Sequence, residues 1–163
     1  DLTTPRGEPI KRTFLFLFVT LILLSLPGPA NASTSFPVTL EVQTVFIEPE
    51  NPFIAYGPAV DEGLICPSGT VTQGKLIAAE RPNGWNFRIE KIFNCADGSG
   101  SFIINLKAHL IFDPYSDTGN WNVLSGEDTY TTLHGRGSLL GIPFGEGEEA
   151  GVLDIYAGFM HLE

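Results

Sequence analysis

The sequence predicts an all-β protein: an antiparallel β-barrel of seven to eight strands with one disulfide, preceded by a cleavable signal peptide. Three observations favour this class. After residue 33, apolar and polar side chains alternate with a period of two. No stretch keeps a helical period, and 18 Gly with 12 Pro punctuate the chain at hairpin spacing. Strands that are apolar on one face bury that face, and lose their exposed edges, by closing into a barrel.

The N-terminal residues have the layout of a secretory signal. Lys11 and Arg12 precede an uninterrupted apolar run at residues 13–26. As a helix this run would be about 21 Å long, shorter than the roughly 30 Å of hydrocarbon that a membrane helix crosses. Ala30-Asn31-Ala32 then supplies the small-x-small pattern that signal peptidase accepts. An uncleaved anchor is the alternative.

Cleavage between Ala32 and Ser33 would separate a signal peptide, residues 1–32, from a barrel domain, residues 33–163. The domain would be secreted or periplasmic and would keep no stable membrane anchor. Losing three basic and two acidic groups would bring the formal net charge from -10 to -11. Such an acidic surface repels a phosphate backbone, so nucleic acid is excluded as a partner.

The first three strands follow from alternation and turn chemistry. Residues 36–46 place Phe36, Val38, Leu40, Val42, Thr44 and Phe46 on one face. A second strand is predicted at about 70–80, where Arg81-Pro-Asn-Gly84 makes a hairpin turn. The third strand then runs from Trp85 and alternates apolar with polar residues as far as Asn94.

The remaining strands alternate in the same way. Asp97-Gly-Ser-Gly100 leads into residues 102–112, where six apolar residues alternate strictly with others. Residues 113–119 are expected to form a loop, followed by shorter strands at 120–125 and 135–142. After an acidic turn, a last strand is predicted at about 151–161. Its expected inward residues are Leu153, Ile155, Ala157 and Phe159, with Asp154 and Tyr156 facing outward.

Cys66 and Cys95 are the only cysteines, and an oxidising compartment favours a disulfide between them. Pairing around the 81–84 turn would put Cys95 opposite roughly Thr70 to Thr72, with Cys66 a few residues upstream. A bridge is therefore within reach. No metal and no cofactor are expected, because the three histidines form no metal-binding spacing. No Gly-x-Ser-x-Gly elbow or reactive-cysteine signature is present, so no catalytic residue is predicted.

Lys91 is the odd residue of the third strand, because alternation places it on the same face as Phe87 and Phe93. A lysine inside a barrel is desolvated, and it can become reactive or bind an acidic ligand. The alternative is a bulge, or a position at the barrel mouth where the amine reaches water. The candidate ligand-binding residues are Lys91, Trp85, Phe87, Phe102 and Ile104.

Two stretches carry a family resemblance. They are Phe93-Asn-Cys-Ala-Asp-Gly-Ser-Gly-Ser-Phe102, and Trp121-Asn-Val-Leu-Ser-Gly126 followed by Tyr130-Thr-Thr-Leu-His-Gly-Arg-Gly137. They resemble uncharacterised secreted bacterial proteins with Gly-rich hairpins, whose fold is similar to the allene oxide cyclase and dirigent β-barrels. The resemblance covers about residues 64–160 and implies a barrel and secretion. It carries over no reaction, because no catalytic position of the plant cyclase is matched.

Three functions remain open. The leading hypothesis is a non-catalytic binding or envelope-associated module, since an eight-stranded barrel is just wide enough for one small ligand, here an apolar one. The first alternative is a cyclase or isomerase that acts on a small apolar ligand inside the barrel. The second is a structural, oligomer-forming barrel; the oligomeric state itself is not predicted. A filled interior would exclude both ligand hypotheses, whereas an open one with Lys91 at its floor would favour the enzyme.

Overall fold

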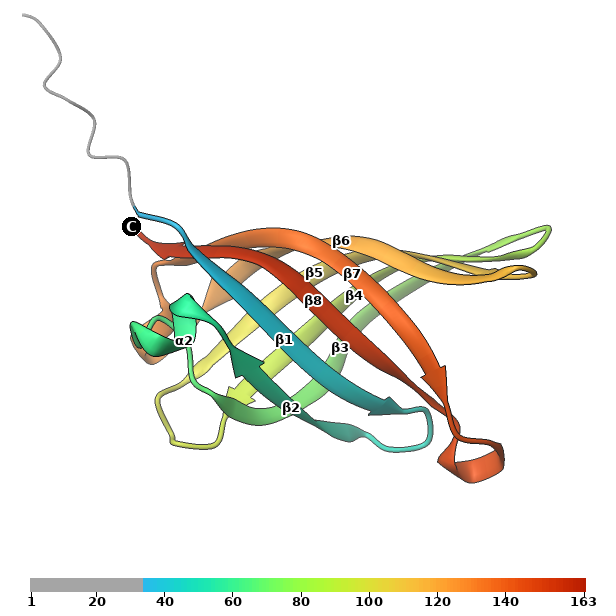
Figure 1. The fold of residues 1–163 in the computed structure, drawn as a ribbon, viewed down its shortest axis with the longest axis horizontal. Helices are drawn as coiled ribbons and strands as arrows, with labels where there is room; N and C mark the ends of the chain where they lie inside the picture. Colours follow the sequence, from blue (N-terminus) through green and yellow to red (C-terminus); the bar gives the residue numbers. More distant parts are fainter. Residues whose placement is uncertain (1–33) are drawn as a thin grey trace, which may run out of the picture. The chain divides into compact units, whose positions relative to one another are not determined.

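The chain forms a closed barrel of eight antiparallel strands that follow one another in sequence order (Figure 1). The computed structural model describes residues 34–163, so the predicted signal peptide and its cleavage site lie outside the described residues. The strands are β1 (Phe36–Val45), β2 (Glu50–Tyr56), β3 (Ser68–Arg81), β4 (Gly84–Cys95), β5 (Ser101–Phe112), β6 (Tyr115–Gly126), β7 (Leu133–Phe144) and β8 (Gly151–Leu162). One α-helical turn and two 3-10 turns lie in the connections: α2 (Pro58–Asp61), η1 (Asp128–Tyr130) and η2 (Gly147–Glu149).

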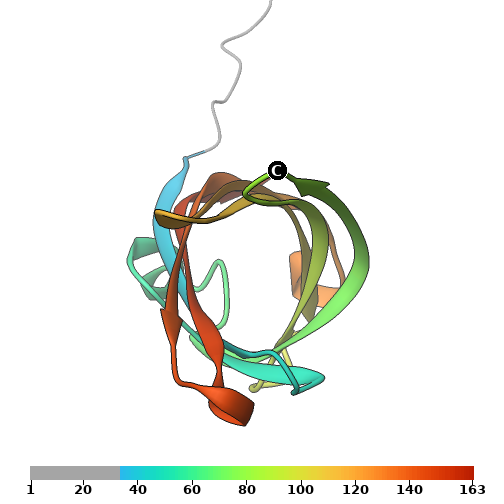
Figure 2. The same ribbon diagram turned by 90° about the vertical axis from the view of Figure 1, so that its right-hand side faces the viewer.

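The up-and-down topology gives the barrel two different ends. Four hairpins lie at one end, which we call the open end; their connections are residues 46–49, 82–83, 113–114 and 145–150. Connections that carry α2 and η1 lie at the opposite end, which we call the packed end. Figure 2 looks along the barrel from the open end and shows the strands closing into a ring.

Aromatic side chains fill the barrel toward the packed end. Phe93 stacks on Phe102 with ring centroids 4.9 Å apart, and the rings of Phe53 and Tyr156 meet Phe93 edge-on at 5.1 and 6.0 Å. Edge-on and offset rings add to the stabilisation from apolar burial. The six members of this aromatic plug are all at most 2% exposed: Phe53, Phe93, Phe102, Trp121, Tyr130 and Tyr156.

Glycine makes room for the largest member of the plug. A Cβ atom at Gly158, on β8, would lie 2.7 Å from Cζ2 of Trp121 and would also overlap the carbonyl oxygen of Arg136. The indole ring therefore packs directly against bare backbone. Its Nε1–H donates a hydrogen bond to the Ser138 carbonyl oxygen at 3.0 Å, which satisfies the polar atom of a buried side chain.

The predicted disulfide is confirmed: Cys66 and Cys95 are bonded, with Cα atoms 5.9 Å apart. Cys95 pairs with Gly69, one residue before the expected range of Thr70 to Thr72. The difference arises because a β-bulge between Gln73 and Leu76 shifts the register of β3 by one residue. The bridge joins the end of β4 to the segment that follows α2. It thereby pins the long β2–β3 connection to the barrel wall.

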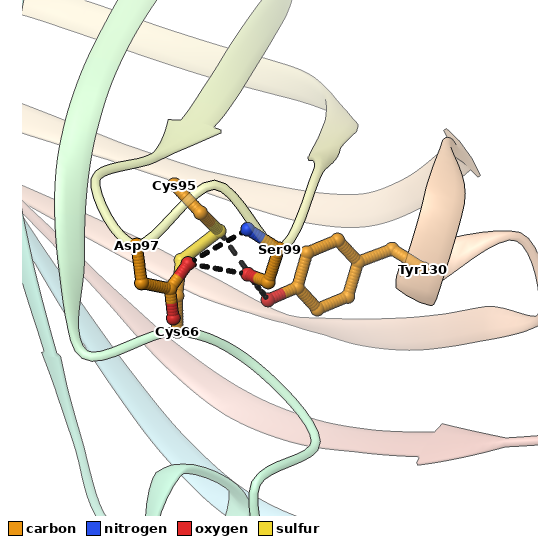
Figure 3. Close-up of a disulfide and its surroundings, with 5 residues drawn as sticks. All are labelled: Cys66, Cys95, Asp97, Ser99 and Tyr130. Carbon is orange, nitrogen blue, oxygen red and sulfur yellow. Dashed lines mark hydrogen bonds between the residues drawn. A yellow bond between two sulfur atoms is a disulfide. The ribbon is translucent and has the colours of Figure 1, made fainter.

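Hydrogen bonds order the turn beside this disulfide (Figure 3). The backbone N–H and the hydroxyl of Ser99 both donate to the Asp97 carboxylate, at 2.9 and 2.6 Å. The Ser99 hydroxyl also lies 2.7 Å from the Tyr130 hydroxyl, which is itself 3.3 Å from Sγ of Cys95. The Gly-rich turn between β4 and β5, the disulfide and η1 are thus connected.

The facing predicted for the last strand was wrong. Asp154 and Tyr156 point into the barrel, where they are 7% and 0% exposed, whereas Phe159 is 55% exposed. Leu153, Ile155 and Ala157 share the outer face of β8 with Phe159. Both faces of this strand carry large side chains, so alternation by itself did not decide which face is buried.

Other predicted boundaries also need correction. The segment at 113–119 is not a loop: residues 113–114 make a tight turn, and β6 begins at Tyr115. Both β6 and β7 are longer than predicted, and β2 was not predicted at all. Phe46 lies beyond the end of β1 and is 67% exposed. The closed eight-stranded barrel itself is confirmed.

Candidate functional site

The open end of the barrel contains a cavity of about 460 Å³. Its wall is mainly apolar and is formed by Phe87, Ile89, Leu106, Ala108, Leu110 and Leu139. Aromatic side chains from three hairpins, Phe46, Phe112, Tyr115 and Phe144, surround the mouth. The volume and the apolar lining are typical of sites for small molecules.

Polar side chains close the cavity at its inner end. What we call the polar floor consists of Thr44 from β1, Lys91 from β4, Asp117 from β6 and Asp154 from β8, and Gln73 from β3 lines the cavity beside it. Lys91 and Asp154 are each 7% exposed. Along β4 the next inward residue is Phe93, so the polar floor rests on the aromatic plug.

Strand register brings the two carboxylates to the same level of the barrel. Asp117 pairs with Gly141 across β6 and β7, and Gly141 pairs with Asp154 across β7 and β8. Gly141 separates the acids without a side chain of its own. A Cβ atom at this position would overlap the Asp117 carboxylate, so glycine is what leaves room for that group.

Burial raises the pKa of both acids, and the charge of Asp154 raises that of Asp117 further. The pKa of Asp117 is raised from 3.8 to about 6, first by burial and then by Asp154, while Lys91 partly opposes the shift. Burial also raises the pKa of Asp154. Lys91 opposes that shift, as does the Thr44 hydroxyl, which donates a 2.9 Å hydrogen bond to Oδ2 of Asp154.

Lys91 lies within the polar floor without a direct partner. Among residues 34–163, no carboxylate oxygen lies within 4.0 Å of its amine and no hydrogen-bond acceptor is in range. Burial lowers the pKa of Lys91, and the charges of Asp154 and Asp117 partly oppose this. A second pocket of about 100 Å³, whose lining includes Glu48 and Asn51, adjoins Lys91 on the side of β1 and β2.

The Tyr156 hydroxyl is a buried polar group of the barrel interior. It is buried next to the polar floor on β8 and has no hydrogen-bond partner in the described part of the chain. Burial, with the charges of Asp154 and Asp117, raises the pKa of this phenol well above 10.0. The group therefore stays neutral.

The structure brings only part of the sequence-predicted site together. Lys91 and Phe87 line the cavity. Trp85 stacks on Phe87 with centroids 6.2 Å apart, but it lies in a separate shallow pocket toward the end of the hairpin. Phe102 and Ile104 are 0% exposed within the packed core and do not reach the cavity wall.

Sequence reasoning missed Thr44, Asp117 and Asp154 as members of the site. Asp154 had been assigned to the outer face and Asp117 to a loop. For the two acids, a signal was present in their spacing from tyrosine residues. Asp117 lies two residues after Tyr115 and Asp154 two residues before Tyr156, so each acid shares a strand face with a tyrosine.

The chain was compared with protein-family models, curated proteins and solved structures, and none of them matches it. Within residues 34–163, no helix is long and apolar enough to span a bilayer. In the same range, no three His, Cys, Asp or Glu side chains are grouped to hold a metal ion.

Proposed function

We propose that this protein binds a small apolar molecule in the cavity at the open end of its barrel. The observation that supports this is the unequal filling of the interior. Aromatic rings fill the packed end, whereas about 460 Å³ is left open between apolar walls at the other end. A role that needed only a rigid barrel would not require this cavity, because close packing stabilises a protein interior and voids cost stability.

Export is part of the proposal. The Cys66–Cys95 disulfide is the kind of crosslink that forms and persists in an oxidising compartment. The apolar leader predicted from the sequence supports the same location. A secreted or periplasmic protein with such a cavity is suited to carry or sequester an apolar molecule that dissolves poorly in water.

Titration with the apolar dye N-phenyl-1-naphthylamine tests binding. We expect a saturable rise in fluorescence with one site per chain. Ala108 lies in the cavity wall, so Ala108→Phe should fill the cavity and weaken dye binding at least tenfold. The neighbouring Lys107 is exposed on the outer face, and Lys107→Phe is the matched control. The proposal fails if the dye does not saturate, or if both variants bind it equally while their near-UV circular dichroism shows folded protein.

A second candidate function is an isomerase or cyclase acting in the same cavity. The observation that favours it is the polar floor, where Asp117 has a pKa of about 6 and is able to exchange protons near neutral pH. The test is incubation with 2-undecanone in D2O. An enzyme should accelerate deuterium uptake next to the carbonyl, and Asp117→Asn should abolish the acceleration. If deuterium uptake is no faster than without protein, the isomerase candidate fails and ligand binding remains as the proposed function.

A further inference from the structure

We propose that Lys91 captures apolar aldehydes and ketones in the cavity as a reversible Schiff base. The ligand class would then be a carbonyl compound with an aliphatic or aromatic body. This inference rests on the proposed function, because the carbonyl compound has to enter the cavity before it meets the amine.

The amine of Lys91 is positioned at the cavity. Lys91 is 7% exposed, and its amine has no hydrogen-bond or ion-pair partner among residues 34–163. Its side chain lines the cavity. The amine therefore has no protein partner to give up before it meets a ligand in this space. The other two lysines in this range, Lys75 and Lys107, are exposed outside the barrel.

The surroundings of the amine favour its reactive form. An apolar wall disfavours the ammonium form, and the neutral amine is the form that attacks a carbonyl carbon. The lowered pKa of Lys91 agrees with this. The charged groups that face it are Asp117 on β6, Asp154 on β8 and, through the adjoining pocket, Glu48.

The reaction needs no oxidant or reductant. Nζ of Lys91 attacks the carbonyl carbon and forms the C–N bond, while the carbonyl oxygen takes up a proton and the nitrogen loses one. The resulting hydroxyl group then leaves with a second proton as water and the C=N bond forms, which gives a protonated imine that becomes the imine when the nitrogen loses its remaining proton. Amine and carbonyl therefore give imine and water. Asp117, whose pKa of about 6 allows both protonation states, is placed on the same floor to supply and accept these protons.

The same floor would stabilise the product. A protonated imine carries one positive charge, as the lysine ammonium does. Asp117 and Asp154 then serve as its counter-ions, and the apolar wall contacts the body of the ligand. Water in the open cavity hydrolyses the imine again, so capture is reversible.

Reductive trapping tests the inference. The protein is incubated with decanal and sodium cyanoborohydride at pH 7, and the modified lysines are identified by peptide mass mapping. We expect labelling of Lys91 at least tenfold faster than labelling of Lys107 or Lys75. Lys91→Arg should remove the fast adduct, whereas Lys107→Arg, the matched control, should keep it. Labelling confined to the two exposed lysines would overturn the inference.

Protection by an unreactive analogue separates this inference from the proposed function. Excess 1-decanol should slow labelling of Lys91 without affecting Lys107, and this readout uses the unaltered protein if Lys91→Arg does not fold. Unchanged labelling of Lys91 would overturn capture inside the cavity. If decanol displaces the dye but decanal leaves Lys91 unmodified, Schiff-base capture fails and the proposed function stands. If the dye does not bind at all, both fail.

Discussion

Replacing Asp117 with asparagine should stabilise the protein at neutral pH. Burial and the facing Asp154 raise the pKa of Asp117 from 3.8 to about 6, so the folded chain holds this proton more tightly than the unfolded chain. The resulting stabilisation is fully present below about pH 3.8 and is lost as the pH rises to about 6. Above that pH, the folded protein contains a carboxylate that would be better solvated in the unfolded chain.

The size of the effect follows from the shift. A change from 3.8 to about 6 corresponds to about 3 kcal/mol, at about 1.36 kcal/mol for each pKa unit. Asp117 is only half-buried, so solvent screens part of this energy and we expect about 1–2 kcal/mol. Asparagine has nearly the same shape and does not ionise. Asp117→Asn should therefore be more stable than the wild type by about that amount at pH 7 and nearly equal to it at pH 3.5.

Urea unfolding from pH 3.5 to pH 7, with the disulfide intact, measures this difference. Relief of the overall negative charge would also stabilise the protein, so the control is Glu148→Gln, which removes one exposed acid outside the cavity. Equal gains for the two variants would refute the assignment to the cavity. So would an Asp117→Asn protein that is less stable than the wild type at pH 7.

Three further predictions concern stability and are measured by urea unfolding. The Cys66→Ser/Cys95→Ser protein should lose about 3.6 kcal/mol, the chain-entropy value for a loop of about 30 residues; a loss under 1 kcal/mol would contradict this account. Phe93→Ala should lose about 3–5 kcal/mol, because it removes the ring at the centre of the plug. Gly158→Ala should lose about 1–3 kcal/mol through overlap with Trp121. Gly74→Ala, where the nearest atom would be 3.2 Å away, is its control and should change stability less.

The barrel was predictable because alternation repeats in many segments and turn residues separate them. The row of six apolar residues from Phe102 to Phe112 and the turn at Asp97–Gly100 were both placed correctly. The disulfide followed from the number of cysteines and from one hairpin. Each of these inferences depends on local sequence or on a single pairing.

Strand β2 was not predictable in the same way. It has the sequence ENPFIAY, in which a glutamate, an asparagine and a proline come first. Such residues are depleted in strands. Asn51 is nevertheless buried, because its Oδ1 accepts a 2.7 Å hydrogen bond from the backbone N–H of Val45. This hydrogen bond within the β1–β2 hairpin outweighs the low strand propensity of the residues.

The polar floor depends on relations between strands that the sequence alone does not reveal. Lys91 was recognised because a single charged residue interrupted an apolar row. Apolar residues lie on both faces of β8. Only the pairing of β8 with β1 and β7 in the closed barrel determines that Asp154 points inward. The approach of Asp117 to Asp154 requires two successive pairings through Gly141. Alternation along one strand contains none of this information.

The division of the interior into an aromatic plug and an open cavity affects how such a protein can evolve. The rings around Phe93 hold one half of each strand together, while Phe87, Leu110 and Leu139 face the empty half. Substitutions in the second group leave the first group intact. The shape and lining of the cavity are therefore free to diversify on a scaffold whose folding depends on other residues, and a designer is able to reshape the mouth without rebuilding the barrel.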